Sequence, residues 1–176
     1  MIDLSIYNGQ KVLITGHTGF KGAWLSIWLN KLGAKIIGVS SKEYSNAYVY
    51  KKAGLNKLLF ADVKADICDY KTLKNIFNKY EPHIVFHLAA EPIVRRSYDT
   101  PLNTFQVNVI GTANVLECIR NTSSVKAAVI VTSDKCYKNN EGKKPFTEED
   151  ELGGNDPYSC SKACAELIIN SYKTSF

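Results

Sequence analysis

The 176-residue sequence lacks the long apolar runs and the leader that mark membrane and secreted proteins. No apolar run reaches the roughly 20 residues that a membrane span requires. The first residues, Met1 to Ser5, lack the basic start and long apolar core of a signal peptide. We therefore expect a chain that neither binds a membrane nor is secreted.

The five cysteines show no CxxC pair, and their odd number argues against a disulfide framework. Cys160 and Cys164 stand four residues apart on a predicted helix, a spacing that is open to metal binding. No His or Cys pair follows nearby to complete such a site, so packing is the preferred interpretation and no metal is expected. Free cysteines predict a reducing, cytoplasmic compartment.

The sequence also has no polybasic arm. Its net charge of +5 comes from 22 basic and 17 acidic residues, and the Lys/Arg pairs at 51–52, 95–96 and 143–144 lie far apart. We interpret this charge as solvated surface with a bias toward anionic small molecules, and expect no nucleic-acid binding. A content of 45% hydrophobic residues indicates one ordinary globular domain, without repeats or low-complexity tracts.

What the sequence does have is a glycine-rich turn near its start. Residues 11–15 predict a buried strand, residues 23–32 predict a helix, and Gly16, Gly19 and Gly22 lie between them with the spacing GxxGxxG. Glycines let the backbone turn tightly and let a phosphate approach, while free N–H groups at the helix start face the anion. The alternative is a tight turn without a ligand.

Predicted strands and helices alternate along the rest of the chain. Strands are predicted at 34–40, 58–63, 83–88 and 125–132, and helices at 70–80, 103–120 and 157–176. Asp69 is the expected N-cap of the helix at 70–80. Residues 92–101 are predicted to form a turn-rich connection and 138–155 a polar loop. The helix at 103–120 is expected to present one shared face, made of Phe105, Val109, Ala113, Leu116 and Ile119.

This alternation, with nearly continuous apolar strands, predicts an α/β fold. We expect a doubly wound parallel sheet, Rossmann-like, of strand order 3-2-1-4-5 and covered by helices on both faces. Ligands in such sheets bind at the carboxyl ends of the strands where the order reverses, here strands one and four.

The end of the second strand leaves the choice of dinucleotide open. An Asp or Glu usually binds the ribose hydroxyls there in NAD-binding folds, but this strand ends on Ser40, Ser41 and Lys42, and Glu43 comes late. Serines can still hydrogen-bond ribose, whereas Lys42 could tolerate a 2′-phosphate.

Four side chains are candidates for chemistry: Ser133, Asp134, Tyr158 and Lys162. Tyr158 and Lys162 stand four apart and share a face of the last helix. A lysine ammonium beside a phenol lowers the pKa of the tyrosine, which turns it into a base near neutral pH. Ser133, at the end of strand five, can hold a substrate hydroxyl toward Tyr158. The alternative is a surface Tyr–Lys contact without a catalytic role.

With the glycine turn, these residues make the sequence similar to the extended short-chain dehydrogenase/reductase superfamily, in its sugar-nucleotide branch. Within that branch it resembles the CDP-glucose 4,6-dehydratases. Related dTDP- and GDP-sugar dehydratases carry Asp-Glu where this sequence has Asp134-Lys135. The segments that carry the resemblance are Ile14 to Gly22, His87 to Pro92, Val94 to Tyr98, Asn108 to Thr112, Thr132 to Tyr137 and Asp156 to Ser159.

The resemblance implies an internal redox cycle on CDP-glucose with NAD as cofactor. Hydride leaves C4 of the sugar for NAD while Tyr158 takes the C4 hydroxyl proton. A base then removes the C5 proton, and water leaves C6 with a proton from Asp134. Hydride returns to C6, which gives CDP-4-keto-6-deoxyglucose. Lys135 takes the position of the C5 base; a salt bridge to Asp134 or a surface charge is its alternative role.

Further residue roles follow from the resemblance. The residues expected to bind NAD are Gly16, Gly19, Phe20 through its N–H, Gly22, Asp66, Ile67, Leu88, Ala89, Ala90, Tyr158 and Lys162. Glu91 and Arg96 are expected to face the substrate. Arg96 could instead fix a loop, and Asp66 could instead cap a turn. The histidines His17, His83 and His87 are expected to be structural.

The family continues after the helix at 157–176 with a substrate-binding domain. The resemblance therefore implies that residues 1–176 are an NAD-binding Rossmann domain without that domain, with the outer edge of strand five uncovered. It also implies a homodimer through the helices at 103–120 and 157–175. Two other functions stay open: another NAD(P)-dependent sugar-nucleotide epimerase or reductase, and a non-catalytic dinucleotide-binding fragment.

Overall fold

The computed structural model describes residues 3–41, 47–139, 142 and 145–176, and these form a five-stranded parallel sheet of order β3-β2-β1-β4-β5. The predicted fold class and strand order are confirmed. β1 is central, paired with β2 on one side and β4 on the other, so the order reverses between β1 and β4. The strands are β1 (Lys11–Thr15), β2 (Lys35–Ser40), β3 (Ala61–Lys64), β4 (Ile84–His87) and β5 (Ala127–Ile130).

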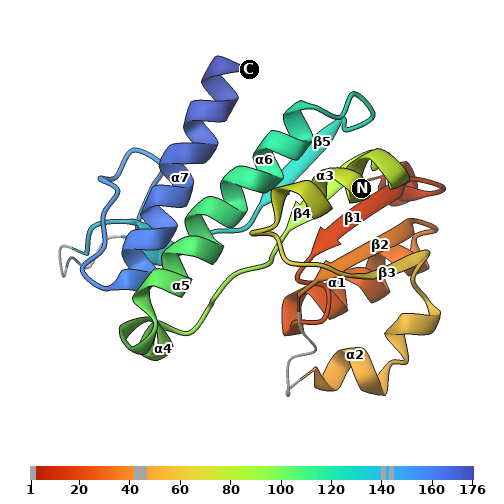
Figure 1. Ribbon diagram of the computed structural model, residues 1–176, viewed down its shortest axis with the longest axis horizontal. Helices are drawn as coiled ribbons and strands as arrows, with labels where there is room; N and C mark the ends of the chain where they lie inside the picture. Colours follow the sequence, from red (N-terminus) through yellow and green to blue (C-terminus); the bar gives the residue numbers. More distant parts are fainter. Residues whose placement is uncertain (1–2, 42–46, 140–141, 143–144) are drawn as a thin grey trace.

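Helices pack on both faces of the sheet, with α3, α6 and α7 on the near side in Figure 1. The α-helices are α1 (Phe20–Lys31), α2 (Tyr48–Lys52), α3 (Tyr70–Tyr80), α4 (Val94–Asp99), α5 (Pro101–Phe105), α6 (Thr112–Arg120) and α7 (Pro157–Ser175). A π-helical segment, η3 (Gln106–Gly111), joins α5 to α6. Short 3₁₀ turns are η1 (Leu4–Tyr7), η2 (Leu55–Lys57) and η4 (Asp134–Cys136).

The alternation of side chains along β1 divides the core in two. Leu13 points to the face covered by α3 and α6, where it packs with Phe77 and Val115. Val12 and Ile14 point to the other face and pack with Leu29 of α1. Because successive strand side chains point to opposite faces, one short strand anchors both helical layers.

Local capping explains the bounds of α3, which match the prediction. The Thr72 N–H donates to Asp69 Oδ1 at 3.1 Å, so Asp69 caps the helix start as expected. The apolar residues Leu73 and Phe77 are fully buried. The helix ends at Glu81, which adopts a left-handed conformation with φ 47° directly before Pro82.

Two predicted boundaries were wrong because local hydrogen bonds compete with the pattern. The third strand begins at Ala61 rather than at 58, since the N–H groups of Leu58 and Leu59 donate to the Leu55 carbonyl in a turn. Residues 92–101 are not all turn: they contain α4. Its buried Ser97 donates to the Val94 carbonyl at 2.6 Å.

The predicted single helix at 103–120 is divided by the π segment, and its predicted apolar face is not the most buried one. Thr104, Asn108 and Thr112 are each at most 3% exposed, whereas Phe105 and Val109 are half-buried. Polar residues occupy the inner face because each has a hydrogen-bond partner there. Hydrophobicity alone could not reveal such a face.

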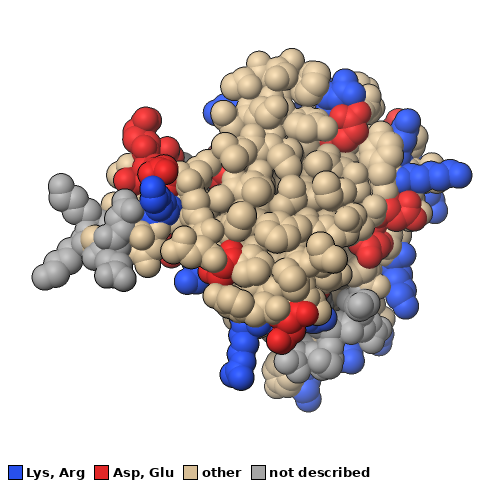
Figure 2. Space-filling view, turned by 60° about the vertical axis from the view of Figure 1, so that its left-hand side comes forward, with Lys and Arg blue, Asp and Glu red and all other residues tan. Residues whose placement is uncertain are grey.

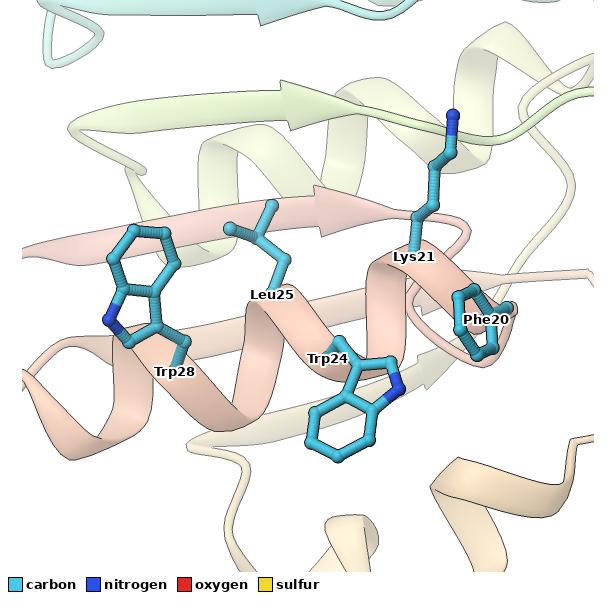
Figure 3. A pocket seen from close by; sticks show the side chains of 5 residues that line it. All are labelled: Phe20, Lys21, Trp24, Leu25 and Trp28. Carbon is cyan, nitrogen blue, oxygen red and sulfur yellow. The ribbon is translucent and has the colours of Figure 1, made fainter.

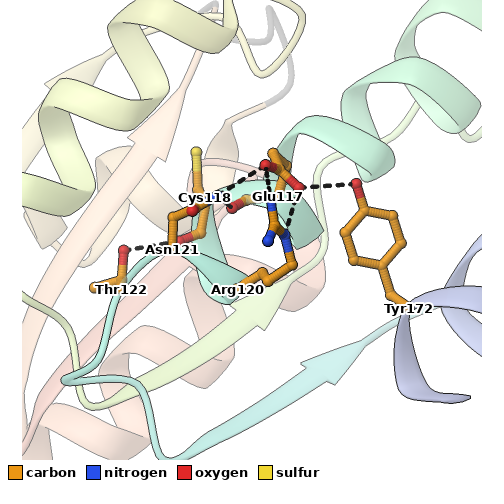
Figure 4. Close-up of polar contacts among 6 residues, drawn as sticks. All are labelled: Glu117, Cys118, Arg120, Asn121, Thr122 and Tyr172. Carbon is orange, nitrogen blue, oxygen red and sulfur yellow. Dashed lines mark hydrogen bonds and ion pairs between the residues drawn. The ribbon is translucent and has the colours of Figure 1, made fainter. Parts of the chain in front are cut away.

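A polar cluster joins α6 to the far end of α7 (Figure 4). Glu117 accepts two hydrogen bonds from Arg120, at 2.6 and 2.9 Å, and one from the Tyr172 hydroxyl at 3.1 Å. The bonds from Arg120, joined by those from Asn121 and Tyr172, lower the pKa of Glu117 to about 2. The Arg120 guanidinium also lies 4.7 Å from the centre of the Phe176 ring. These contacts hold the C-terminal ends of the two helices together.

β5 is the least covered strand, and Ala127, Ala128 and Val129 are exposed. This agrees with the expectation that its outer edge is uncovered, although here its faces are open as well. Within the described ranges, no helix combines the length and apolar character needed to cross a bilayer.

Candidate active site

The glycine turn closes against the loop that follows β4. Gly16 has φ +73°, and its N–H donates to the Val39 carbonyl at 2.8 Å. A Cβ on Gly16 would lie 2.8 Å from the Ala89 nitrogen. A Cβ on Gly22 would overlap the Gly16 carbonyl oxygen and come 2.8 Å from the His17 Cα. Both positions therefore require glycine.

The start of α1 fits an anionic group. Its N-cap is Gly19, which offers no side-chain cap, and the first N–H groups of a helix have no partner within the helix. These donors and the positive end of the helix dipole suit a phosphate. The Phe20 side chain points outward and is 73% exposed, so only its backbone is available to this turn.

A buried chain of hydrogen bonds joins the ends of β1 and β4 to the helix behind them. Thr15 Oγ1 accepts from the N–H groups of Leu88 and Ala89, both at 3.1 Å, and lies 2.6 Å from His87 Nδ1. His87 Nε2 lies 3.1 Å from Thr112 Oγ1, whose own proton goes to the Asn108 carbonyl. Thr15 therefore donates to Nδ1 and His87 donates from Nε2, which fixes the neutral tautomer.

Burial lowers the pKa of His87 from 6.5 to about 3, and the charge of Lys162 acts in the same direction. Between these values the unfolded chain binds a proton that the folded chain does not. The contribution of neutral His87 to the free energy of unfolding is therefore fully present above pH 6.5. It falls by up to about 1.4 kcal/mol per pH unit as the pH decreases toward 3. Urea unfolding at pH 7 and pH 5 should show a smaller drop for His87→Gln, which can still bond both threonines.

His83→Gln is the matched control, since His83 directly precedes the same strand and its Nδ1 lies 2.7 Å from Gln10 Oε1. The His83→Gln variant should show the same decrease in unfolding free energy between pH 7 and pH 5 as the wild type. A His87→Gln variant with the wild-type decrease would contradict the assignment.

Asn108, in the π segment, connects three parts of the site. Its Oδ1 accepts from the Glu91 N–H at 2.8 Å, and its Nδ2 donates to the Glu91 carbonyl at 3.1 Å and to Ser161 Oγ at 2.9 Å. Ser161 in turn donates to the Tyr158 carbonyl at 2.7 Å. The loop after β4 is thereby fixed relative to the start of α7.

Tyr158 and Lys162 lie on the same buried face of α7, at 8% and 6% exposure. The helix begins with Pro157, is capped by Asp156, and the Tyr158 N–H donates to Ser97 Oγ at 3.2 Å. Burial lowers the pKa of Lys162 to about 8; the charge of Lys21 lowers it further, while Glu166 opposes the shift. Lys162 Nζ also donates to the Val131 carbonyl at 3.4 Å, and the Val131 N–H donates to the His87 carbonyl at 3.0 Å. The Tyr–Lys pair therefore lies at the carboxyl ends of β4 and β5, and β4 is the neighbour of the strand that leads into the glycine turn.

Ser133 caps the short turn η4 after β5, and Asp134 and Lys135 are the first residues of that turn. Ser133 Oγ accepts from the Lys135 N–H at 3.2 Å and donates to Asp134 Oδ1 at 3.1 Å. Asp134 and Lys135 are exposed. In the part of the chain that the structure describes, no ion pair joins Asp134 to Lys135 and no hydrogen bond joins Ser133 to Tyr158. The predicted alternative of an Asp134–Lys135 salt bridge is thus not observed.

The two residues expected to face the substrate pair with each other. Arg96 Nη1 lies 3.6 Å from Glu91 Oε2, and Glu91 is the more buried partner. Arg96 thus has the loop-fixing contact that was its alternative role, and half of its side chain stays exposed.

Other predicted residues have structural contacts. Asp66 Oδ1 accepts from the Cys68 N–H at 2.9 Å, which is a turn cap, and Ile67 is 4% exposed beneath Gly111. His17 is buried over Gly38, with Nε2 3.0 Å from Asp62 Oδ1, as a structural role requires. Lys42 and Glu43, which bear on the choice between NAD and NADP, lie outside the described residues, as do Lys143 and Lys144.

A surface groove extends along α1 from the glycine turn (Figure 3). Four of its side chains are apolar, and the fifth, Lys21, points away from Phe20 and Trp24 toward the strand ends. The groove is lined by Phe20, Lys21, Trp24, Leu25 and Trp28. It lacks converging polar groups, which a catalytic site requires, so the groove itself is not a candidate for the chemistry.

Several site residues were given no role in the sequence analysis, namely Thr15, Lys21, Ser97, Ser161 and Glu166. Glu166 carried a usable signal, because it stands four residues after Lys162 on one helix face. The five cysteines are free, and among the described residues no group of three or more His, Cys, Asp or Glu is arranged to hold a metal.

The comparisons with known proteins agree with this geometry. The family model of GDP-mannose 4,6-dehydratase matches residues 13–176. The CDP-glucose 4,6-dehydratase of Salmonella typhimurium is 43% identical over 176 residues, which are 100% of this chain and 49% of that protein.

Solved structures show the same similarity. The dTDP-glucose 4,6-dehydratase of Bacillus anthracis, in complex with NAD, has a TM-score of 0.79 at 28% identity over 96% of this chain and 52% of its own. An epimerase of Methanothermobacter thermautotrophicus has a TM-score of 0.82 at 30% identity, with coverages of 98% and 50%. The chain spans about half the length of these relatives.

Proposed function

The chain belongs to the GDP-mannose 4,6-dehydratase family, and from that membership we propose that it is the cofactor-binding half of a sugar-nucleotide 4,6-dehydratase acting on CDP-glucose. The observation that carries this proposal is the buried Tyr158–Lys162 pair at the carboxyl ends of β4 and β5, where Lys162 donates to the Val131 carbonyl and Val131 donates to the His87 carbonyl. β4 is the neighbour of β1, the strand that leads into the glycine turn. The 43% identity to a CDP-glucose 4,6-dehydratase over the whole chain supports the substrate.

NAD is the proposed cofactor. The glycine cradle and the uncapped start of α1 fit its pyrophosphate, which Gly16, Gly19, Phe20 and Gly22 would hold through their backbone. The loop of Leu88, Ala89 and Ala90 lies against the same turn, and the Bacillus anthracis relative was solved with NAD. Adenine contacts of Asp66 and Ile67 remain a proposal, supported by their place after β3. When bound, NAD accepts a hydride from a carbon and gives one back.

The chain's own residues would handle the protons. The Tyr158 phenolate would accept the C4 hydroxyl proton of the sugar as its C4 hydrogen leaves. The Lys162 ammonium would stabilise that phenolate, and the Ser133 hydroxyl would orient the C4 oxygen. The backbone bonds of Tyr158 to Ser97 and Ser161 support this assignment, because they hold the start of α7 in place.

Asp134 and Lys135 are proposed for the elimination step. Lys135 would remove the proton at C5, next to the new C4 ketone, and Asp134 would protonate the C6 hydroxyl that leaves as water. Both side chains are exposed on η4, where a sugar could reach them. Glu91 and Arg96 are proposed to face the substrate, with Arg96 leaving its ion pair or sharing it.

A direct assay tests the proposal. CDP-glucose and NAD are incubated with the protein, and the 4-keto product is followed by its alkaline ultraviolet absorbance, with NAD binding measured by calorimetry. We expect NAD binding and product from CDP-glucose. NAD binding without product would favour a non-catalytic dinucleotide-binding fragment, and product from UDP-galactose instead would favour an epimerase. Absence of NAD binding would contradict the proposal.

A homodimer through α5–α6 and α7 is also proposed. Leu102, Ile110 and Leu167 are 85%, 47% and 59% exposed on these helices. Figure 2, in which the side that carries α7 comes forward, shows a broad face with few charged side chains. Two such helix pairs would form a four-helix bundle. Sedimentation should give twice the chain mass of 19.6 kDa, and a monomer mass would contradict this interface. The reducing, cytoplasmic location stays a prediction.

A further inference from the structure

Two hydrogen bonds attach the end of β5 to α7, directly before Ser133. Lys162 Nζ donates to the Val131 carbonyl at 3.4 Å, and Thr132 Oγ1 donates to Glu166 Oε1. Lys162 and Glu166 stand four residues apart, one helical turn, so the strand end contacts two successive turns of the same helix face. These contacts set the distance between Ser133 and the Tyr158–Lys162 pair.

Glu166 is also the acidic neighbour that acts on Lys162. Its charge favours the ammonium form of Lys162 and raises the pKa of this group, against burial and against the charge of Lys21 on α1. The groups that face Lys162 are Glu166 on α7, Lys21 on α1, Cys136 on η4 and His87 on β4. His87 is neutral, so Glu166 supplies the balancing negative charge among them.

We propose that Glu166 is a positioning residue: held by Thr132, it keeps the Lys162 side chain charged and fixes the strand end that carries Ser133 relative to Tyr158. The inference rests on the proposed function for the roles of Ser133, Tyr158 and Lys162. Neither contact requires cofactor or substrate, so both can be tested on the chain alone.

The charge is tested with Glu166→Gln, which keeps an oxygen that can accept from Thr132. The pKa of Lys162 is measured from the pH dependence of its ¹³Cε chemical shift, assigned with Lys162→Met. Removing the negative charge should lower this pKa by about one unit, because the ammonium loses its favourable neighbour. Glu149→Gln, the same change at an exposed loop position, is the matched control and should leave it unchanged. A Glu166→Gln titration that coincides with wild type overturns the proposal.

The hydrogen bond from Thr132 to Glu166 is tested separately with Thr132→Val, which removes the Thr132 hydroxyl but keeps the Glu166 carboxylate. The amide resonances of Ser133 and Lys135 should shift, and Thr132→Ser should restore them. Unshifted resonances in Thr132→Val overturn the anchoring role. If Thr132→Val fails to fold, as judged by circular dichroism, the Glu166→Gln titration still decides. A chain that fails to bind NAD yet shows the Lys162 shift would contradict the proposed function and support the role of Glu166.

Discussion

A Tyr158→Phe variant should turn over CDP-glucose at least about 100-fold more slowly than wild type, with unchanged affinity for NAD. The substitution removes the proposed proton acceptor and nothing else from the side chain. Tyr158 is 8% exposed, and its hydrogen bonds with Ser97 and Ser161 are made by its backbone N–H and carbonyl, not by the phenol oxygen. Turnover is followed by the alkaline absorbance of the 4-keto product, and NAD affinity by calorimetry.

Tyr98→Phe is the matched control, because Tyr98 lies nearby on α4 but is 65% exposed. It should keep wild-type turnover. If Tyr158→Phe retained full activity, the phenol would not be the proton acceptor. If it lost NAD binding and folding together, the effect would be structural.

A Gly22→Ala variant should be destabilised by about 3 kcal/mol and should lose NAD binding. The new Cβ would overlap the Gly16 carbonyl oxygen, which is backbone and cannot rotate away. Either α1 or the glycine turn must move, and the turn also packs against Ala89. Urea unfolding gives the stability, and calorimetry gives the affinity for NAD.

A glycine-to-alanine change at an open position is the control for the loss of stability. A Cβ on Gly142 has nothing within 4 Å, so Gly142→Ala should stay within about 0.5 kcal/mol of wild type. A Gly22→Ala protein with the wild-type urea midpoint would show that α1 does not approach Gly16 as closely as described.

Elements with strong local signals were predictable from the sequence. The strand at Lys11–Thr15 and the helix at Tyr70–Tyr80 have the predicted bounds, because an apolar run and an Asp69 cap determine them locally. The π segment was not predictable. Its buried Asn108 is stable there only because Glu91 and Ser161, far away in sequence, supply partners. The pattern of hydrophobic residues does not show which distant residues will supply hydrogen bonds to a buried polar side chain.

At the candidate site, the spacing of residues in the sequence identified Tyr158 and Lys162 as candidates, but it did not show which other residues surround them. The four-residue interval of Tyr158 and Lys162 correctly predicted a shared helix face. The opposing influences of Lys21 and Glu166 on Lys162 depend on how β5, α1 and α7 meet. The ion pair of Arg96 with Glu91 likewise needed coordinates, since both residues belong to a segment without a clear periodicity.

The π segment also determines where the chain can change its length. Successive residues of an α-helix are about 100° apart around its axis, and a π turn holds one residue more than the α turn it replaces. Losing one residue within Gln106–Gly111 would therefore restore a regular α turn and leave the helix after it close to its present orientation, with Val115 and Cys118 still on the sheet. Losing one residue at the start of α6, where no π turn absorbs the change, would rotate everything after it by about 100°. Cys118 would then leave the sheet, and Glu117 would lose Tyr172.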